Sequence, residues 1–316
     1  MIGRLRHVRA EMLGLNRRNH AYLFAYNARD RHRIVDDKQA TKTALEAHRI
    51  PTPQLRTTCD VQWRVAELCD RLALVGDFVL KPARGAGGAG IVVIVDRDGE
   101  RFVKASGARL RRRDLALHAC DVIAGAYSPA GRGDVLLVEE RLVAEPTLAA
   151  LAYRGVPDVR VVVFRGVPVL AMLRLPTRRS DGRANLHLGG VGAGIDVAAG
   201  TTTWAVRRGR RVDRHPDLDV PIGGIAVPAW DDVLLLATRA ADAIGLGFVG
   251  VDVVIDARHG PVVLELNARP GLTIQVANRR GLRPLLDTVA GAELPASAAD
   301  RVTFGRALSS AGRAGS

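Results

Sequence analysis

Apolar residues recur along the chain with two different periods, and the period predicts whether a segment is a helix or a strand. Between Trp230 and Ile244 they recur at intervals of three and four, which predicts one amphipathic helix. Short runs rich in β-branched residues, such as "IVVIV" at residues 91–95, predict strands instead. Because strands joined by turns dominate after residue 135, the pattern as a whole indicates an α+β fold.

The same patterns predict further elements. A helix is expected from Asp37 until the two prolines of "RIPTP" end it. The other predicted helices cover residues 60–74 and 113–125, and the other predicted strands cover residues 78–81, 101–104, 135–140, 159–164 and 167–173.

The chain of 316 residues is long enough for two or three closely packed lobes. We expect a short N-terminal segment at residues 1–36 that wraps onto the body. A lobe with a glycine-rich loop is expected at residues 37–135, and a second lobe with a C-terminal hairpin at residues 136–295. Residues 296–316 are rich in Ala, Ser, Gly and Arg, which predicts a flexible tail.

Oxygen-bearing side chains alternate with apolar ones in the last predicted hairpin. Glu265 and Asn267 in "LELNARPG" project from one face of a strand, and the preceding strand "VGVDVVID" carries Asp252. If the loop between these strands has an even number of residues, Asp252 lies directly across from Glu265, at roughly 5 Å between Cβ atoms. An odd loop would place Asp252 on the other face.

Two carboxylates at that separation repel each other unless a proton or a cation lies between them. A small set of oxygen ligands suits Mg²⁺, whose remaining ligands are often substrate phosphates, with Mn²⁺ as an alternative metal. The hairpin pattern therefore predicts a magnesium site at Asp252, Glu265 and Asn267. A solvated hairpin face with unrelated charges remains an equally good interpretation of the hairpin taken alone.

A glycine-rich loop, "GAGGAG" at residues 85–90, formally matches the dinucleotide-binding pattern. It leads into a β-branched run and not into a helix, so a flexible hairpin loop is the better interpretation. The backbone N–H groups of such a loop, including those of Gly87 and Gly88, can bind phosphates, and Lys81 on the strand before it adds a positive charge. Alone, a mobile turn and a surface lysine are the simpler interpretations.

The formal net charge of +13 favours anionic partners, and it arises mostly from arginine. The arginine runs at residues 109–113 and 207–211 lack interleaved aromatic residues, so a solvated basic surface is favoured over a nucleic-acid interface. Three cysteines without CxxC spacing argue against a disulfide framework and a zinc site. No signal-like or membrane-spanning run is evident, so we expect a cytoplasmic protein without a membrane partner.

The ordered set of motifs from about Asn16 to about Leu286 resembles the ATP-grasp superfamily. Within it, the chain is most similar to the glutamate ligases that modify ribosomal protein and to their alpha-L-glutamate ligase-like relatives. The motifs are "NRRN", "VDDKQATK", "FVLKPARGAGGAGIVVI", "GVPDVRVVVFRGVPVLAMLRLPT", "SDGRANLH", "HPD", "GVDVVID" and "LELNARPGLTIQVAN". The resemblance implies an ATP-grasp fold in which the nucleotide lies between two antiparallel β-sheet lobes.

The resemblance also implies roles for single residues. It places Arg174 as the arginine that steadies an acyl-phosphate, and Asp252, Glu265 and Asn267 as metal ligands. His187 is in the same motif as Arg183 and Asn185, but the residues alone, apart from the resemblance, predict only a structural hydrogen-bonding histidine there. The residues implied to bind the nucleotide are Lys38 and Lys81 at the phosphates, Gly87 and Gly88 in the loop, Glu139 and Glu140 at the adenine hinge, Asp158 on the ribose side, and Arg183 and Asn185.

The implied function is that of an ATP- and Mg²⁺-dependent carboxylate–amine ligase that forms an amide or peptide bond through an acyl-phosphate. It would act on small-molecule or peptide substrates, with glutamate or a similar amino acid as the acid. The ribosomal-protein enzymes carry a whole α/β domain before the "DK" segment, whereas 36 residues precede Asp37 here, so the acid and the amine are left open. The alternatives are a non-catalytic nucleotide-binding or RNA-binding protein with this fold, and a kinase that stops after phosphoryl transfer.

Overall fold

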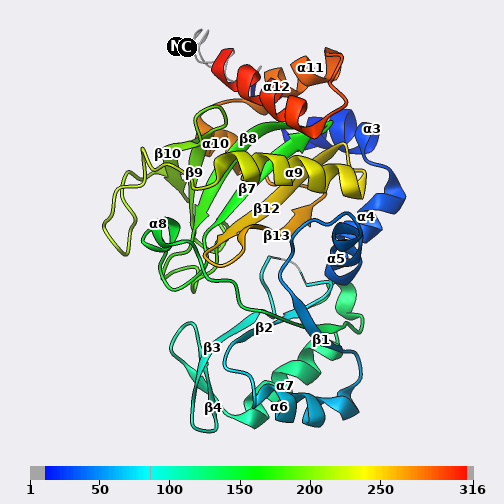
Figure 1. The fold of residues 1–316 in the computed structure, drawn as a ribbon, viewed down its shortest axis with the longest axis vertical. Coiled ribbons are helices and arrows are strands. Elements are labelled where there is room, and N and C mark those ends of the chain that lie inside the picture. The colour runs from blue at the N-terminus through cyan, green and yellow to red at the C-terminus, as the bar shows by residue number, and fades with distance from the viewer. Residues whose placement is uncertain (1–10, 86, 312–316) are drawn as a thin grey trace. The chain divides into compact units, whose positions relative to one another are not determined.

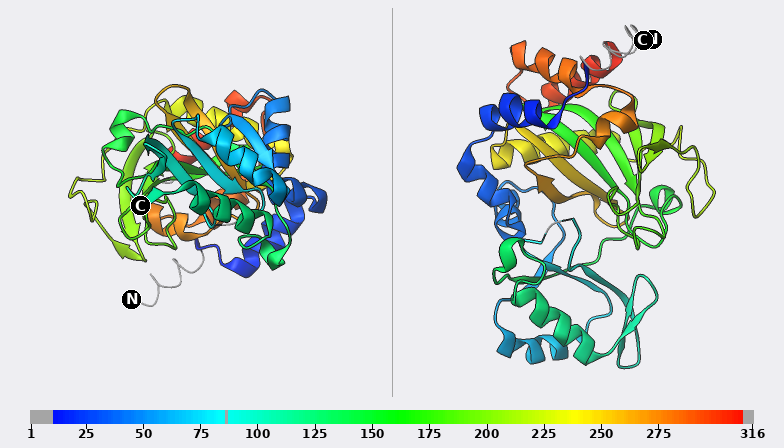
Figure 2. Two further views of the ribbon diagram at one scale, coloured as in Figure 1. Left: turned by 90° about the horizontal axis from the view of Figure 1, so that it is seen from below. Right: turned by 180° about the vertical axis from the view of Figure 1, so that it is seen from behind.

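The computed structural model describes residues 11–85 and 87–311, and these form two compact units (Figure 1; Figure 2). Of the described residues, the first unit takes those up to Asp36, Ala40–Thr52 and those from Ala144 onward. The second unit comprises Asp37–Gln39 and Pro53–Val143. The main boundary therefore lies at residue 143, eight residues after the one that the sequence predicts. Residues 40–52, predicted to belong to the lobe at 37–135, are instead part of the first unit.

The second unit is built on a six-stranded antiparallel sheet in the order β1-β6-β2-β3-β4-β5. Apolar side chains of strands β2, β3 and β6 pack with α6 and α7 around Phe78 and Phe102, whose rings meet edge to face at 5.8 Å. Its elements are β1 (Leu55–Cys59), η2 (Gln62–Arg64), α6 (Val65–Leu72), β2 (Phe78–Pro82), β3 (Val92–Asp98), β4 (Arg101–Lys104), β5 (Arg109–Leu110), α7 (Arg112–Ile123), η3 (Pro129–Gly131) and β6 (Leu136–Glu139).

The first unit is built on a seven-stranded antiparallel sheet in the order β11-β10-β9-β8-β7-β12-β13. Its strands are β7 (Asp158–Phe164), β8 (Val167–Leu175), β9 (Val191–Asp196), β10 (Thr201–Arg207), β11 (Arg210–Arg211), β12 (Phe248–Asp256) and β13 (Gly260–Asn267). Its helices are α2 (Leu15–Arg17), η1 (Arg18–Leu23), α3 (Phe24–Tyr26), α4 (Arg29–Val35), α5 (Lys38–Ala47), α8 (Pro146–Ala149), α9 (Trp230–Ile244), α10 (Thr273–Asn278), α11 (Leu282–Gly291) and α12 (Ala298–Ala311). The first two residues of α5 are counted with the second unit.

The two faces of this sheet carry separate apolar cores because side chains alternate along each strand. Residues such as Val159, Val161 and Val251 pack under α9, while Val162, Phe164 and Phe248 pack under η1, α10 and α11. Because both faces of this sheet are covered, its valine-rich strands are continuous apolar runs in the sequence.

The N-terminal segment, as far as it is described, packs onto the first unit as expected. The side chain of Asn27 exchanges two 2.8 Å hydrogen bonds with the backbone of Phe248, and Gln275 Oε1 accepts one from Leu13 N at 2.8 Å. No helix within the two described ranges is long and apolar enough to cross a membrane.

The prediction of a flexible C-terminal tail is wrong for most of its length. Residues 298–311 form helix α12, in which Val302 is buried against the core under α9. Gly305 lies so close to β8 that a Cβ atom there would meet Pro168 O at 2.5 Å. Small residues that look like a linker in the sequence here allow the backbone of a helix to approach a sheet closely. The remainder of the predicted tail, residues 312–316, lies outside the described residues.

The hairpin of β12 and β13 has the predicted pairing of Asp252 with Glu265, but its loop differs from the predicted one. Its loop is odd, because Asp256 pairs with Gly260 and three residues connect them. A bulge at Leu264 then shifts the ladder by one residue, so that Val253 pairs with Val263 but Asp252 pairs with Glu265. The expected opposition of Asp252 and Glu265 is confirmed, whereas the even loop on which it was based is wrong.

Candidate active site

A buried network of charged side chains lies on three adjacent strands of the first unit. Asp158 and Arg160 come from β7, Arg174 from β8 and Asp252 from β12, and cross-strand pairing sets Asp158 opposite Arg174 and Arg160 opposite Asp252. All four project from the face that also carries Val162 and Met172. Strand alternation puts the charges on one face of their strands, and the cross-strand pairing of β7 with β8 and β12 brings them together.

Asp252 is held by two guanidinium groups at once. Arg160 donates from Nε to Oδ1 and from Nη2 to Oδ2, both at 2.6 Å, and Arg174 Nη2 donates to Oδ2 at 2.6 Å. Arg174 Nε donates to Asp158 Oδ1 at 2.5 Å, so Arg174 bridges the two carboxylates. The side chains of Arg160 and Arg174 are 11% and 12% exposed, and these bonds use Nε and Nη2. The Nη1 edge of each guanidinium is therefore the edge that can meet an anionic ligand.

Burial and pairing give the two aspartates different protonation behaviour. Burial raises the pKa of Asp158 to about 6 although Arg174 opposes the shift. Burial acts in the same direction on Asp252, but Arg160 and Arg174 together hold its pKa below the usual range. Burial disfavours the charge of Arg174, yet Asp158 and Asp252 raise its pKa above the ordinary value. Near neutral pH Asp252 is therefore ionised, and Asp158 is much closer to its titration point than an ordinary aspartate.

The predicted metal ligands are next to this network. Glu265 is the cross-strand partner of Asp252 and is half-buried, and Asn267 Nδ2 donates to Asp252 Oδ2 at 3.2 Å. The donor set is chemically suited to Mg²⁺, because all three side chains offer oxygen atoms from neighbouring strand positions. Binding through Asp252 would require its oxygens to exchange arginine hydrogen bonds for the metal, and Asn267 to turn its amide oxygen inward. No group of three His, Cys, Asp or Glu side chains suited to a metal is found in the described ranges, so other oxygen ligands would have to complete the shell.

In the second unit, Lys81 and Glu139 form a buried ion pair. The Nζ atom of Lys81 on β2 is 2.6 Å from Oε2 of Glu139 on β6, with side chains 7% and 2% exposed. Lys38 Nζ donates to the carbonyl oxygen of Gly85, at the start of the glycine-rich loop. Glu140 is bound to the backbone of Gln54, whose N–H donates to Oε1 at 2.8 Å. The predicted phosphate and hinge residues thus lie on the sheet of the second unit or next to it.

The glycine-rich loop adopts a conformation that depends on glycine. Gly87, Gly88 and Gly90 have φ values of 63°, 81° and 73°, in the left-handed region. A Cβ atom at Gly90 would lie 2.7 Å from the ring of Tyr127. The loop connects β2 to β3 directly, which confirms the interpretation as a hairpin and excludes the dinucleotide-binding turn before a helix.

The remaining predicted residues lie on the loop between β8 and β9. Arg183 is 3.7 Å from Asp181 and 40% exposed, and Asn185 Oδ1 accepts a 2.9 Å hydrogen bond from His187 N. This loop belongs to the same unit as Arg174, since it begins directly after the strand that carries it.

The structure therefore places the predicted residues in two groups. Asp158, Arg174, Asp252, Glu265 and Asn267 gather in the first unit, and Lys81, Glu139, Glu140, Gly87 and Gly88 belong to the second, with Lys38. Sequence reasoning missed Arg160. The signal was present, because in "PDVRVVVF" Arg160 stands two residues after Asp158 and so shares its face of the strand.

Residues 17–291 match the family model described as sugar-transfer associated ATP-grasp. The chain is 28% identical over 270 residues to cyanophycin synthetase of Geminocystis herdmanii, covering 79% of this chain and 29% of that relative. It is 28% identical over 174 residues to a probable alpha-L-glutamate ligase of Sodalis glossinidius, covering 51% of this chain and 47% of the relative. The solved structure of ATP-grasp ligase PsnB complexed with minimal precursor is 19% identical, with a TM-score of 0.46, over 84% of this chain and 63% of PsnB.

The match over most of the chain confirms the resemblance seen in the motifs, and the protein is an ATP-grasp protein. More narrowly, the chain belongs to the sugar-transfer associated ATP-grasp family. It spans about 29% to 47% of the length of these two curated relatives.

Proposed function

We propose that this protein is an ATP-dependent carboxylate–amine ligase that forms an amide or peptide bond through an acyl-phosphate. The observation that carries the proposal is the buried network of Asp158, Arg160, Arg174 and Asp252, which lies within the ATP-grasp match. A purely structural core rarely keeps two arginines and two aspartates buried together, because desolvation of each charge is costly.

The reaction has two steps. A carboxylate oxygen of the acid attacks the γ-phosphorus of ATP, the bond to the bridging oxygen breaks, and ADP leaves. The amine nitrogen then attacks the acyl carbon, the bond between carbon and the phosphate oxygen breaks, and inorganic phosphate leaves and takes up the proton that the amine loses. A carboxylate needs the first step because its own oxygen is a poor leaving group.

The arginines suit the second step. Arg174 is fixed through Nε and Nη2 by Asp158 and Asp252, and Arg160 is fixed through the same two atoms by Asp252 alone. A guanidinium held by two carboxylates is oriented before the substrate arrives, which is the condition for stabilising the negative charge that develops on a tetrahedral intermediate. Asp158 is proposed for the ribose side and Arg174 for the acyl-phosphate.

In the second unit, Lys38 and Lys81 are proposed to neutralise phosphate charge, and Gly87 and Gly88 to donate backbone N–H groups to phosphate oxygens. Glu139 and Glu140 are proposed for the adenine hinge, and Arg183 and Asn185 for further contacts with the nucleotide. Asp252, Glu265 and Asn267 are proposed to hold Mg²⁺, or Mn²⁺, which when bound would withdraw charge from the transferring phosphoryl group.

For substrates, we propose a small-molecule or peptide carboxylate, with glutamate or a similar amino acid, and an amine acceptor. Support comes from two curated relatives, one named as a cyanophycin synthetase and one as a probable alpha-L-glutamate ligase.

The test is ADP release by the purified protein with Mg-ATP, with amino acids and small peptides offered singly and in pairs. A ligase releases ADP at a high rate only when an acid and an amine are present together. Release with an acid alone, accompanied by a stable phosphorylated product, would indicate a kinase. Tight Mg-ATP binding without release from any pair would favour a non-catalytic nucleotide-binding or RNA-binding protein.

The metal ligands are tested by Glu265→Ala. We expect loss of ADP formation by at least about a hundredfold. Cooperative unfolding should be retained, because the residue is only half-buried and lies on the outermost strand of its sheet. Glu293→Ala, at an exposed glutamate after α11, is the matched control and should be silent. Turnover by Glu265→Ala at the wild-type rate would remove this residue from the site.

A further inference from the structure

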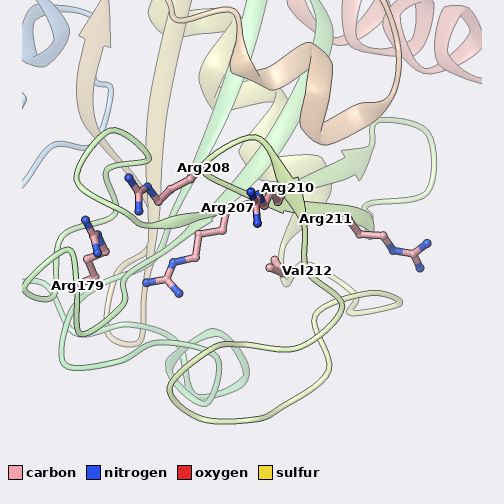
Figure 3. Close-up of a pocket in the computed structure, with 6 residues that line it drawn as sticks. All are labelled: Arg179, Arg207, Arg208, Arg210, Arg211 and Val212. Carbon is pink, nitrogen blue, oxygen red and sulfur yellow. The ribbon is translucent and has the colours of Figure 1, made fainter.

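A basic hollow lies at the β10–β11 end of the sheet of the first unit. It has a volume of about 660 Å³ and is lined by Arg179, Arg207, Arg208, Arg210, Arg211 and Val212 (Figure 3). Five of the six lining side chains are therefore guanidinium groups. In Figure 3 they come from the hairpin and from a neighbouring loop, and Arg211 extends away from the side where Arg179 lies.

Backbone geometry fixes the hollow. Arg208 and Gly209 form the two-residue turn of the β10–β11 hairpin, with φ values of 50° and 76°, as a hairpin turn of type I′ requires. Arg207 Nε donates to the carbonyl oxygen of Gly189 at 3.1 Å, which ties the hairpin to the loop between β8 and β9. Arg179 comes from that same loop and packs along Gly189. Four of the five arginines thus lie on a hairpin that is hydrogen-bonded to the loop that carries the fifth.

The charge of the hollow is only slightly offset. Arg211 Nε is 2.6 Å from Asp213 Oδ1 in an exposed pair, which is worth little in water. Arg211 also lies over the ring of Trp204 at 4.5 Å, and Arg279 lies over it at 4.6 Å. The indole is therefore occupied by two cations, which leaves it poorly suited to stack on a nucleic-acid base.

The hollow borders a free sheet edge. Strand β11 is the outermost strand, and Val212 N donates to Ala205 O at 3.0 Å. Because hydrogen-bonded pairs alternate along an antiparallel ladder, the next pair, Val206 and Arg211, is a non-hydrogen-bonded pair. The N–H and C=O of Arg211 consequently point outward from the edge, where an extended peptide can pair with them.

The sheet also connects this edge to the candidate active site. Arg174, Gly192, Val206 and Arg211 are successive cross-strand partners on β8, β9, β10 and β11. With about 4.8 Å between neighbouring strands, Arg211 lies about 14 Å from Arg174 along the sheet.

We propose that the hollow binds an acidic peptide segment of the acceptor substrate, docked in extended form along β11 with its carboxylates on the arginines. Guanidinium groups pair with carboxylates in a planar, two-bond geometry, and carboxylates spaced along a chain match arginines spaced along a hairpin. The assignment to the acceptor rests on the proposed ligase function, whereas the binding of an acidic peptide does not.

The test is fluorescence anisotropy with a labelled hexaglutamate peptide, measured without nucleotide at low and moderate salt. Arg208→Gln/Arg210→Gln removes two charges from exposed positions of the hairpin, and we expect it to weaken binding about tenfold or more. Arg101→Gln/Arg113→Gln removes two exposed charges in the second unit and is the matched control, with wild-type affinity expected. A hexaglutamine peptide should not bind.

Equal weakening in the two double variants would overturn the proposal, because binding would then reflect net charge and not the hollow. Absence of hexaglutamate binding would overturn it as well. Tighter binding of a single-stranded oligonucleotide than of hexaglutamate at the same salt, lost in the hairpin variant, would assign the hollow to nucleic acid instead.

The binding assay and the ligase assay fail independently. If hexaglutamate binds at the hairpin but no acid and amine pair releases ADP, the peptide site stands and the ligase proposal fails. If the ligase is active on small substrates but the peptide does not bind, the ligase proposal stands and this inference fails.

Discussion

At the scale of single residues, substitutions in the buried pair of Lys81 and Glu139 can distinguish an effect on stability from an effect on function. Lys81→Met should destabilise the protein by about 3–5 kcal/mol, because it leaves a buried carboxylate without the ammonium group that balances it. The double variant Lys81→Met/Glu139→Gln should recover much of that loss, since neither charge remains. Urea unfolding measures the stabilities.

ADP release by the same two variants tests the proposed role of Lys81 at the phosphates. Both should be inactive, because stability restored by Glu139→Gln does not restore the positive charge. Turnover of the double variant close to the wild-type rate would show that Lys81 acts only as the partner of Glu139.

Asp158 predicts a specific dependence of stability on pH. Its pKa is raised to about 6 in the folded protein from an ordinary value of 3.8, so between these values the folded state holds a proton that the unfolded state releases. The contribution of Asp158 therefore favours folding at pH 4 and is lost as the pH rises through 6, with a slope approaching about 1.4 kcal/mol per pH unit.

The comparison that isolates this effect is wild type against Asp158→Asn, by urea unfolding between pH 4 and 7. The free energy of unfolding of the wild type, relative to the variant, should increase as the pH falls through the window. Asp252 does not interfere there, because its lowered pKa moves its own effect to more acidic pH. Parallel curves for the two proteins would contradict the raised pKa.

At the scale of elements, the bulge in β13 makes a prediction about two leucines. In a regular strand Leu264 and Leu266 would share one face, but here Leu264 is 36% exposed and Leu266 only 2%. Leu266→Ala should cost about 2–5 kcal/mol in unfolding free energy, and Leu264→Ala less than about 1 kcal/mol. Equal costs would mean that the hairpin is regular and that Asp252 does not oppose Glu265.

The same hairpin shows what sequence reasoning can and cannot reach. Helix α9 and strands β2, β3 and β4 were predicted closely, because a strong period or a β-branched run fixes them locally. The bulge at Leu264 could not be predicted, since it depends on which leucine the assembled sheet buries: Leu266 joins the core and Leu264 does not. The division of the chain was placed too early because β6 joins the sheet of the second unit by pairing with β1 and β2.

Sequence reasoning likewise reached only some residues of the candidate site. Strand alternation alone placed Glu265 and Asn267 together, whereas Asp158 and Arg174 were reached only through the resemblance of their motifs. Arg160 shares a strand face with Asp158, but its role was missed because its partner, Asp252, is 92 residues away, and that pairing exists only once the sheet has formed.

At the scale of the whole molecule, the C-terminal helix α12 is part of the first unit and not an appendage. Gly305→Leu should lower the free energy of unfolding by about 1–3 kcal/mol or more. Even the Cβ atom of the new side chain would meet Pro168 O at 2.5 Å and push the helix away from β8. Thr303→Leu, at an exposed position of the same helix, is the control and should change stability by less than about 0.5 kcal/mol. Thermal unfolding measures both, and neutral results for both would restore the idea of a flexible tail.

The indole of Trp204, which Arg211 and Arg279 both contact, gives the basic hollow an intrinsic fluorescence signal. Its emission depends on the charges against its ring, so a carboxylate that draws Arg211 away should change both the intensity and the wavelength of that emission. Because the chain has three tryptophans, a protein in which Trp63 and Trp230 are replaced by phenylalanine would report on Trp204 alone. The molecule thus carries its own optical probe at the edge of the sheet, and docking there could be followed without any attached dye.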